Sequence, residues 1–237
     1  LHFVATERYK KRVIQLGENP KNVFIVGGLG AERILRTKFF SKKKISKLLN
    51  INIKKKLILI NFQPEILMKD TKTMVSETLI ALKKLKDTTL LFTAPGADIN
   101  NNIIYDLIKK FLKDNSNVYF RKSLGARLFY SCMKISDFMV GNSSSGILEM
   151  PSFKKGTLNI GSRQDGRLRS NTILDVIAKN QLVSKKIKFI YSEKFQNKLK
   201  KSKNLYEKPG TIKKIIDKLK KINKSELVKK SFYDINF

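Results

Sequence analysis

A turn rich in small and hydroxyl-bearing residues lies just past the middle of the chain. It runs Gly141-Asn142-Ser143-Ser144-Ser145-Gly146 and directly follows the apolar stretch 138–140. Glycine allows a backbone to approach a ligand closely, and the first N–H groups of a helix starting near Ser144 have no partner inside that helix. Because serine hydroxyls add further donors, we expect this turn to bind a phosphate or diphosphate. The alternative is that the serines only cap the helix.

One carboxylate follows this turn within the same predicted helix. Glu149 lies one to two helical turns beyond the serines. A carboxylate can accept two hydrogen bonds at once, as the two hydroxyls of a ribose require. We therefore expect Glu149 to contact a ribose while the serines hold its phosphates.

A second polar turn, at 159–169, holds a third of the arginines. Arg163, Arg167 and Arg169 fall within seven residues, whereas the whole chain has nine Arg against 41 Lys. A solvated basic loop in this chain would normally carry lysine, and guanidinium groups suit the charge-assisted, paired bonds that a diphosphate accepts. We expect these three arginines to bond to a diphosphate, with Arg163 and Arg167 as the residues assigned to the site.

The remaining reactive side chains are few. Gln63 and Glu65 follow an apolar run at 57–62 and could face a ligand, although a loop glutamine is more often a surface residue. His2 is the single histidine and stands beside apolar residues, so a structural role is favoured and histidine-based catalytic triads and metal sites are excluded. Cys132, the single cysteine, lies in an apolar stretch and is expected to be a buried thiol. We expect neither a metal nor a cofactor.

In the middle of the chain, stretches with the hydrophobic pattern of strands alternate with stretches that have the pattern of helices. This alternation predicts the fold that positions the candidate site residues. Short apolar runs typical of strands buried on both faces alternate with stripes of helical spacing. The predicted strands are 57–62, 89–93, 118–120, 137–140 and 157–160, and the predicted helices are 71–86, 99–111, 124–134 and one from about 144. Such alternation predicts an α/β fold with a doubly wound parallel sheet, whose ligands bind at the carboxyl ends of the strands.

The two ends of the chain differ from this pattern. Residues 1–28 read as a short helix, about Glu7 to Leu16, followed by a strand, Val23 to Val26. Residues 196–237 are lysine-rich and helical, with an interruption at Pro209, and are too poor in apolar residues to form a domain. No apolar run reaches 18 residues, so we expect no membrane span.

The net charge of +31 suggests a nucleic acid as an alternative partner. The excess is almost all lysine and is spread along the whole chain, for example at Lys83, Lys84, Lys109 and Lys113. We interpret it as a composition bias of the source genome and expect no nucleic-acid partner. Tight binding that falls steeply with salt is what the alternative predicts.

As a set, the motifs resemble one enzyme family. The chain is similar to the hydrolysing UDP-N-acetylglucosamine 2-epimerases, including the bacterial sialic-acid and legionaminic-acid pathway enzymes. The matching stretches run nearly end to end in family order: 2–7, 12–18, 26–30, 122–125, 141–149, 151–153, 159–169 and 232–234.

The resemblance implies the C-terminal half of a two-domain, Rossmann-like (GT-B-type) fold. Residues 1–28 would be the tail of a truncated N-terminal domain, 29–195 the UDP-binding domain, and 196–237 helices returning to the first domain. It further implies a cytoplasmic homo-oligomer that acts on a UDP-sugar without a cofactor or a membrane. By the family pattern, Ser143, Ser144 and Glu149 contact diphosphate and ribose, Arg163 lies near the phosphates, and Ser145, Gly146 and Arg167 complete the UDP site.

The implied reaction is removal of the C2 proton and anti elimination of UDP to a glycal. Addition of water then gives N-acetylmannosamine or a diacetylated 6-deoxy analogue. The family usually has His-Pro where this chain has Gln63-Pro64, so Gln63 stands at the position of a catalytic residue. Gln can still donate a hydrogen bond to a phosphate, but it cannot transfer a proton or carry a positive charge. The resemblance places the proton-transferring acids in the first domain, outside this chain. We therefore expect these 237 residues to bind UDP weakly and not to turn over. The alternatives are a GT-B glycosyltransferase and a nonenzymatic UDP-sugar-binding protein.

Overall fold

The computed structural model describes residues 1–64, 71–96, 101–222 and 231–235, which belong to two compact units. The sheet unit comprises 37–203, and the terminal unit comprises 1–36 together with 204–237. Each is described here by itself.

The sheet unit is built on six parallel strands in the order β5-β4-β3-β6-β7-β8. Numbered within the sheet, this is the 3-2-1-4-5-6 order of doubly wound nucleotide-binding folds, and it confirms the predicted fold class. The strands are β3 Lys56–Asn61, β4 Thr88–Thr93, β5 Val118–Arg121, β6 Phe138–Gly141, β7 Gly156–Ile160 and β8 Ile173–Val176. The strand order reverses between β3 and β6.

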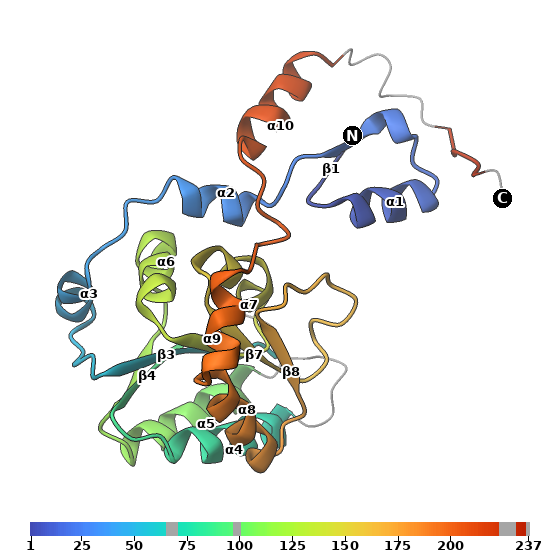
Figure 1. Cartoon of the computed structure of the whole chain (residues 1–237). Helices are drawn as coiled ribbons and strands as arrows, with labels where there is room; N and C mark the ends of the chain where they lie inside the picture. Colours follow the sequence, from blue (N-terminus) through green and yellow to red (C-terminus); the bar gives the residue numbers. More distant parts are fainter. Residues whose placement is uncertain (65–70, 97–100, 223–230, 236–237) are drawn as a thin grey trace. The chain divides into compact units, whose positions relative to one another are not determined.

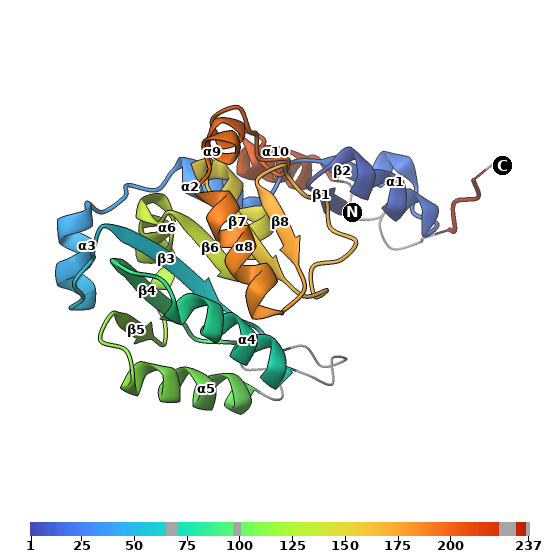
Figure 2. The ribbon, with the colours of Figure 1, turned by 60° about the horizontal axis from the view of Figure 1, so that its bottom comes forward.

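Helices cover both faces of this sheet (Figures 1 and 2). One face carries α4 Thr71–Lys83, α5 Asn101–Lys113 and α8 Asn180–Ile190, which pack against one another. The other carries α6 Gly125–Ile135, the short α7 Ser145–Leu148 and a 3₁₀ turn, Met150–Phe153. The unit is completed by α3 Lys42–Leu49 and α9 Glu193–Lys200.

Burial on both faces explains the uniformly apolar strands. Along β3, Ile58 and Ile60 belong to the core cluster that includes α4, α5 and α8 residues. Leu57 and Leu59 alternate with them and are also at most 2% exposed. Because neighbouring strand residues point to opposite faces, a strand covered on both sides needs apolar residues at every position.

Most predicted elements are found within one to three residues of their expected ends. The main difference is the helix expected from about residue 144, since α7 has only four residues and gives way to the 3₁₀ turn at Met150. Pro151 accounts for this, because proline cannot donate the backbone bond that a continuing helix requires. The start of the stripe expected at 99–111 lies outside the described residues. In this unit, strand β8 and helices α3 and α8 were not predicted.

The terminal unit joins segments from the two ends of the chain. Parallel strands β1 His2–Val4 and β2 Val23–Ile25 accompany α1 Glu7–Gln15, α2 Leu29–Leu35 and α10 Thr211–Lys220. Glu32 accepts a hydrogen bond from the Gly210 N–H at 3.1 Å, and the Thr211 hydroxyl donates to the carbonyl of Val26 at 2.7 Å. The arginine Arg36, one turn along, lowers the pKa of Glu32. The assignment of 1–28 to the tail of a first domain, of 29–195 to a UDP-binding domain and of 196–237 to helices returning to the first domain stays a prediction.

Three smaller expectations concern Cys132, His2 and membrane-spanning helices. Cys132 is buried, and burial raises the pKa of its thiol to about 12, as suits a core thiol rather than a nucleophile. His2 lies 2.8 Å from the carboxylate of Glu18. Among the helices in the described part of the chain, none has the length and apolar character needed to cross a membrane.

Candidate functional site

The serine-rich turn lies where the strand order of the sheet reverses. Asn61 at the end of β3 is paired with Gly141 at the end of β6. Gly141 has a φ of +133°, and a Cβ there would lie 2.0 Å from the carbonyl oxygen of Asn61. Only glycine fits this approach, which brings the loops after β3 and β6 together. In open parallel sheets this crevice is the usual ligand site.

Asn142 joins three loops at this edge of the sheet. The residue is fully buried, and its side chain accepts from the backbone N–H of Gln63 at 2.6 Å and donates to the backbone carbonyl of Gln63 at 2.9 Å. Its own carbonyl accepts from Arg163 Nη1 at 3.2 Å and from Gln164 Nε2 at 2.7 Å. The loops after β3, β6 and β7 therefore share one hydrogen-bonded centre.

The three serines differ in their contacts within the turn. Ser143 Oγ accepts from the N–H of Ser145 at 3.3 Å, a local bond that shapes the turn. Ser144 is the N-cap residue of α7, yet within the described chain its side chain makes no capping bond. All three serines are half-buried. Because α7 is so short, its dipole adds little, so an anion here would depend on local N–H groups, hydroxyls and nearby guanidinium groups.

Glu149 lines a cavity of about 320 Å³ at the carboxyl edge of the sheet. The lining also includes Asn61, Thr93 and Ser145, together with the segment 122–126 that leads into α6. One carboxylate oxygen, Oε2, is shielded from solvent and has no hydrogen-bond partner among the described residues. A buried acceptor without a partner is costly, which makes Glu149 a candidate ligand-binding group.

The environment of Glu149 favours its neutral form. Burial raises the pKa of this carboxyl to about 6, while the hydrogen bond from Ser145 and the positive charge of Arg167 lower it in part. At neutral pH the group is ionised and can accept hydrogen bonds. The carboxyl group therefore takes up a proton as the pH falls through about 6.

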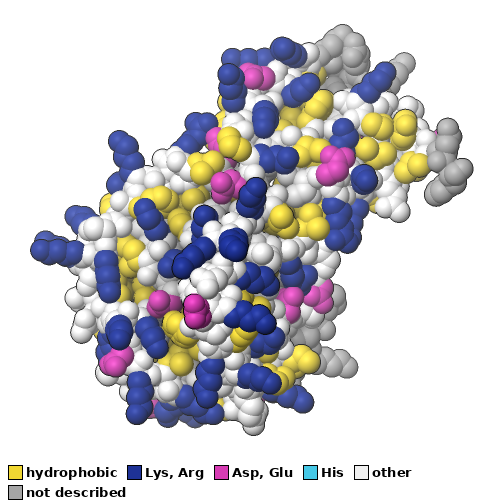
Figure 3. Space-filling view, in the orientation of Figure 1, with side chains coloured by type: hydrophobic (Ala, Val, Ile, Leu, Met, Phe, Trp, Pro, Cys, Tyr) yellow, Lys and Arg dark blue, Asp and Glu magenta, His cyan; other side chains and the backbone are white. Residues whose placement is uncertain are grey.

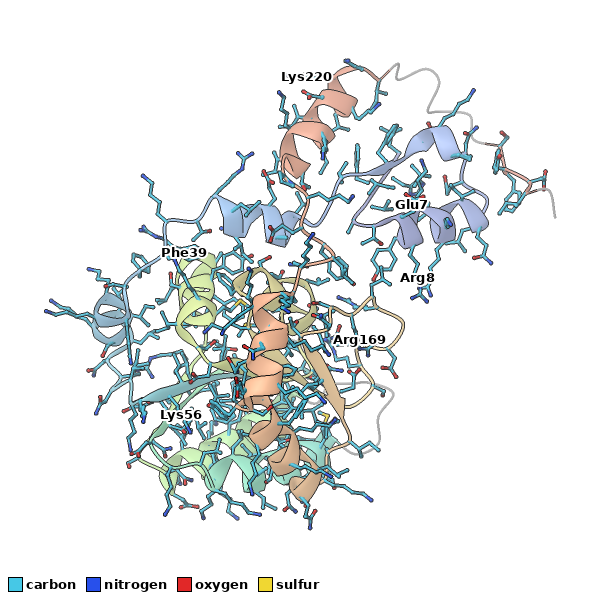
Figure 4. All side chains as sticks on the ribbon, viewed as in Figure 1. Glu7, Arg8, Phe39, Lys56, Arg169 and Lys220 are labelled. Atoms are coloured by element: carbon cyan, nitrogen blue, oxygen red, sulfur yellow. The ribbon has the colours of Figure 1, made fainter. Side chains whose placement is uncertain are left out.

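The arginine-rich turn supplies two guanidinium groups to this region. Arg163 is anchored to the Asn142 carbonyl and is half-exposed, and Arg167 is exposed and acts on Glu149 through its charge. Arg169, at the β8 end of the loop (Figure 4), instead forms ion pairs with Asp165 at 2.8 Å and Asp175 at 3.1 Å. Those pairs hold the loop, which leaves Arg163 and Arg167 as the candidate phosphate-binding arginines.

Gln63 lies in the loop after β3, with its side chain bonded to neighbouring loops. Its Nε2 donates to Asn61 Oδ1 at 2.6 Å, and its Oε1 accepts from the N–H of Gly96 at 2.6 Å. The other candidate in this loop, Glu65, lies outside the described residues. The structure thus places Gln63 beside the site with its amide already engaged.

Sequence reasoning missed the residues that organise the site. Asn61 donates to Thr93 Oγ1 at 2.6 Å, and Gln164 is 1% exposed in an otherwise exposed loop. Asn61 and Asn142 both stand at the carboxyl ends of buried strands, a position that could have singled them out. Apart from the bond between Gln63 and Asn61, their partners are more than 20 residues away in the sequence, so those pairings were not predictable.

The sequence profile of the UDP-N-acetylglucosamine 2-epimerase family matches residues 1–220. A hydrolysing GDP/UDP-N,N'-diacetylbacillosamine 2-epimerase of Campylobacter jejuni is 42% identical over 177 residues, covering 74% of this chain and 46% of the relative. The polysialic acid biosynthesis protein P7 of Escherichia coli is 36% identical over 241 residues, covering 99% of this chain and 60% of the relative. The chain therefore spans less than two thirds of the length of either relative.

Solved structures show the same fold. A Staphylococcus aureus MnaA structure with UDP superimposes with a TM-score of 0.72 at 18% identity, covering 100% of this chain and 64% of that one. The Neisseria meningitidis UDP-GlcNAc 2-epimerase bound to UDP-GlcNAc gives a TM-score of 0.69 at 19% identity, covering 93% and 60%.

Proposed function

Because the chain belongs to the UDP-N-acetylglucosamine 2-epimerase family, we propose that it is the UDP-binding part of a hydrolysing 2-epimerase. The proposed whole-protein reaction converts a UDP-N-acetylhexosamine into UDP and the free 2-epimer. One observation carries the proposal. Glu149, the serine turn (141–146) and the arginine loop (159–169) lie close together at the point where the strand order of the sheet reverses.

The groups of this site suit the three parts of UDP. The carboxylate of Glu149 accepts from the ribose hydroxyls, which would satisfy its buried Oε2. The hydroxyls of Ser143 and Ser144 donate to the diphosphate. Ser145 and Gly146 shape the turn instead, because the Ser145 hydroxyl bonds to Glu149 and the N–H groups of both residues donate to Ser143. Arg163 and Arg167 supply positive charge. The cavity between Glu149 and segment 122–126 is left for the uracil ring.

The chemistry assigned to these residues is stabilisation of the leaving group. When the C1–O bond breaks, negative charge grows on the departing diphosphate. Prearranged donors and guanidinium groups stabilise that charge without transferring a proton. Removal of the C2 proton and hydration of the resulting glycal are proposed to use groups outside this chain.

The relatives suggest the substrate class. The Campylobacter relative is named as a 2-epimerase of N,N'-diacetylbacillosamine nucleotides, and the Escherichia coli relative is named as a polysialic acid biosynthesis protein. We therefore propose N-acetylmannosamine or a diacetylated 6-deoxy analogue as the product. We further propose that the whole protein works in the cytoplasm as a homo-oligomer without a cofactor.

Calorimetric titration of the 237-residue chain with UDP tests the binding proposal directly. We expect measurable UDP binding, weaker binding of UMP because it lacks the β-phosphate, and no detectable binding of free N-acetylglucosamine. Equal affinities for UDP and UMP would show that this site does not bind the β-phosphate.

Product analysis of the full-length protein tests the reaction. Incubation with a UDP-N-acetylhexosamine and no acceptor should release UDP together with the free 2-epimer. Turnover that appears only when an acceptor sugar is added would show a glycosyltransferase. Binding without turnover under either condition would show a nonenzymatic UDP-sugar-binding protein.

A further inference from the structure

Gln63 stands where the resemblance leads one to expect histidine, and every polar group of this residue has a partner inside the protein. Its backbone N–H and carbonyl both bond to the side chain of Asn142 in the loop after β6. Its side-chain amide bonds to Asn61 at the end of β3 and to Gly96 after β4. One residue therefore joins the loops that follow three adjacent strands.

Their other hydrogen-bond partners determine which way the side-chain amides of Asn61 and Gln63 are turned. Asn61 Nδ2 donates to Thr93 Oγ1 at 2.6 Å and to the carbonyl of Ala94 at 3.2 Å. Since a backbone carbonyl can only accept, Asn61 must turn its Oδ1 toward Gln63. The backbone N–H of Gly96 can only donate, so Gln63 must turn its Oε1 toward Gly96. The position requires a side chain that donates on one side and accepts on the other.

This bonded series forms part of the wall of the candidate UDP site. Asn61 and Thr93 line the 320 Å³ cavity together with Glu149, and Asn142 begins the serine turn. We infer that Gln63 is a positioning residue, which holds the loops after β3, β4 and β6 in place around the UDP site and neither transfers a proton nor contacts phosphate. The inference rests on the proposed function.

The isosteric substitution Gln63→Glu tests this directly. An ionised carboxylate keeps the acceptor for Gly96 but faces Asn61 Oδ1 without a proton to donate. We expect the UDP affinity of the 237-residue chain to fall about tenfold at pH 7.5, the size of one lost hydrogen bond with its repulsive replacement. UMP affinity should fall by the same factor, because the whole wall is displaced. A loss confined to UDP would instead indicate a direct contact with the β-phosphate and overturn the inference.

The pH dependence separates positioning from a general loss of folding. As the pH falls through about 4.3, the ordinary pKa of a Glu side chain, the introduced carboxyl takes up a proton and regains the missing donor. The ratio of variant to wild-type affinity should therefore rise toward one. Comparison with the wild type cancels the ionisation of UDP and of Glu149, because both proteins share them. The charged Lys122 also lines the cavity and is likewise common to both proteins. A ratio that stays constant with pH would contradict the proposed donor role.

The matched control is Gln196→Glu in helix α9. Gln196 is also half-buried, and its Nε2 donates to the carbonyl of Ile190 at 2.7 Å outside the site. The same chemical change there should leave UDP affinity unaltered.

A second pair of variants keeps the inference testable if Gln63→Glu does not fold. Thr93→Val removes the hydroxyl that holds Asn61, and Thr93→Ser retains it. We expect the valine variant to bind both UDP and UMP more weakly than the serine variant, by the same factor for the two ligands. Equal affinities of the two variants would count against the bonded series. Absence of UDP binding by the wild type would refute the proposed function itself, whereas wild-type binding that Gln63→Glu leaves unchanged would refute only the role of Gln63.

Discussion

Glu149 combines partial burial, an unpartnered oxygen and a raised pKa. The desolvation that raises its pKa also makes its ionised form costly in the unliganded protein. A ligand that donates hydrogen bonds to this carboxylate removes part of that cost. Under the proposed function, the ionised carboxylate lowers the stability of the unliganded protein and raises its affinity for UDP, as functional groups often do.

The variant Glu149→Gln should weaken UDP binding about tenfold at pH 7.5, because an amide offers one acceptor atom to the two ribose hydroxyls. Since the pKa of Glu149 is about 6, wild-type affinity should decline toward that of the variant as the pH falls below 6. Calorimetry across pH 5 to 8 measures both curves, with the exposed Glu193→Gln as the control variant. A pH-independent gap between the wild type and Glu149→Gln would argue against a carboxylate–ribose contact.

The same variant should be more stable than the wild type without ligand. The folded-state pKa of Glu149 lies above its ordinary value of 4.5, so the folded state binds the proton more tightly than the unfolded state. The free energy of unfolding therefore falls as the pH rises from about 4 to 7, by about 2 kcal/mol for this group. Denaturant unfolding should show Glu149→Gln more stable at pH 7.5 by up to that amount, and equal to the wild type near about pH 4. Greater stability of the wild type at pH 7.5 would contradict this.

At the scale of elements, the close packing of α7 on β7 positions the serine turn. Gly146 lies in α7, and a Cβ there would approach Thr157 Cγ2 in β7 to 2.5 Å. The Thr157 hydroxyl donates to the carbonyl of Gly146 at 2.7 Å. The hydrogen bond between α7 and β7 therefore requires glycine at position 146, because a larger residue would collide with Thr157.

Gly146→Ala should destabilise the protein by about 1–3 kcal/mol, because the added methyl group forces α7 away from a buried strand. UDP affinity should fall with it, since the serines move with α7. Thr157→Ser removes the obstructing methyl group and retains the hydroxyl bond. The double variant should therefore recover most of the loss in thermal unfolding and calorimetry. Failure of Thr157→Ser to rescue Gly146→Ala would show that packing against β7 is not the cause.

At the scale of the whole molecule, the groups proposed to bind UDP belong to one unit. Residues 37–203 contain the complete parallel sheet, the serine turn and the arginine loop. The helices on both faces of the sheet also lie within this range, so its core comes from one continuous stretch.

A protein consisting only of residues 37–203 should fold and bind UDP with an affinity within roughly threefold of the whole chain, as expected for a compact unit with its own core. Circular dichroism and calorimetry of the two proteins make the comparison. Loss of UDP binding in a folded 37–203 protein would assign part of the site to the terminal unit.

The strong positive charge is also a property of the whole molecule. On the face drawn in Figure 3, Lys and Arg side chains are spread over many elements rather than gathered in one patch. We expect no detectable binding of a labelled DNA or RNA oligonucleotide at about 0.15 M salt in fluorescence anisotropy. Binding that is tight at this salt concentration and falls steeply as salt increases would instead support a nucleic-acid partner.

The sequence by itself determined the fold class and the chemistry available at the strand ends. Strands buried on both faces must be apolar throughout, and helices on their surfaces must repeat apolar residues at helical spacing, so local patterns were sufficient to predict a doubly wound sheet. The clusters at 141–149 and 159–169 were visible for the same reason, because each is continuous in the chain.

Only the tertiary structure decided which side chains are already engaged. Arg169 looked equivalent to Arg163 in the sequence but pairs with Asp165 and Asp175. Gln63 looked like a substituted catalytic residue but has its amide bonded to Asn61 and Gly96. Such contacts depend on loops from different strands meeting at one edge of the sheet. Strand order brings them together, and no local pattern in the chain records it.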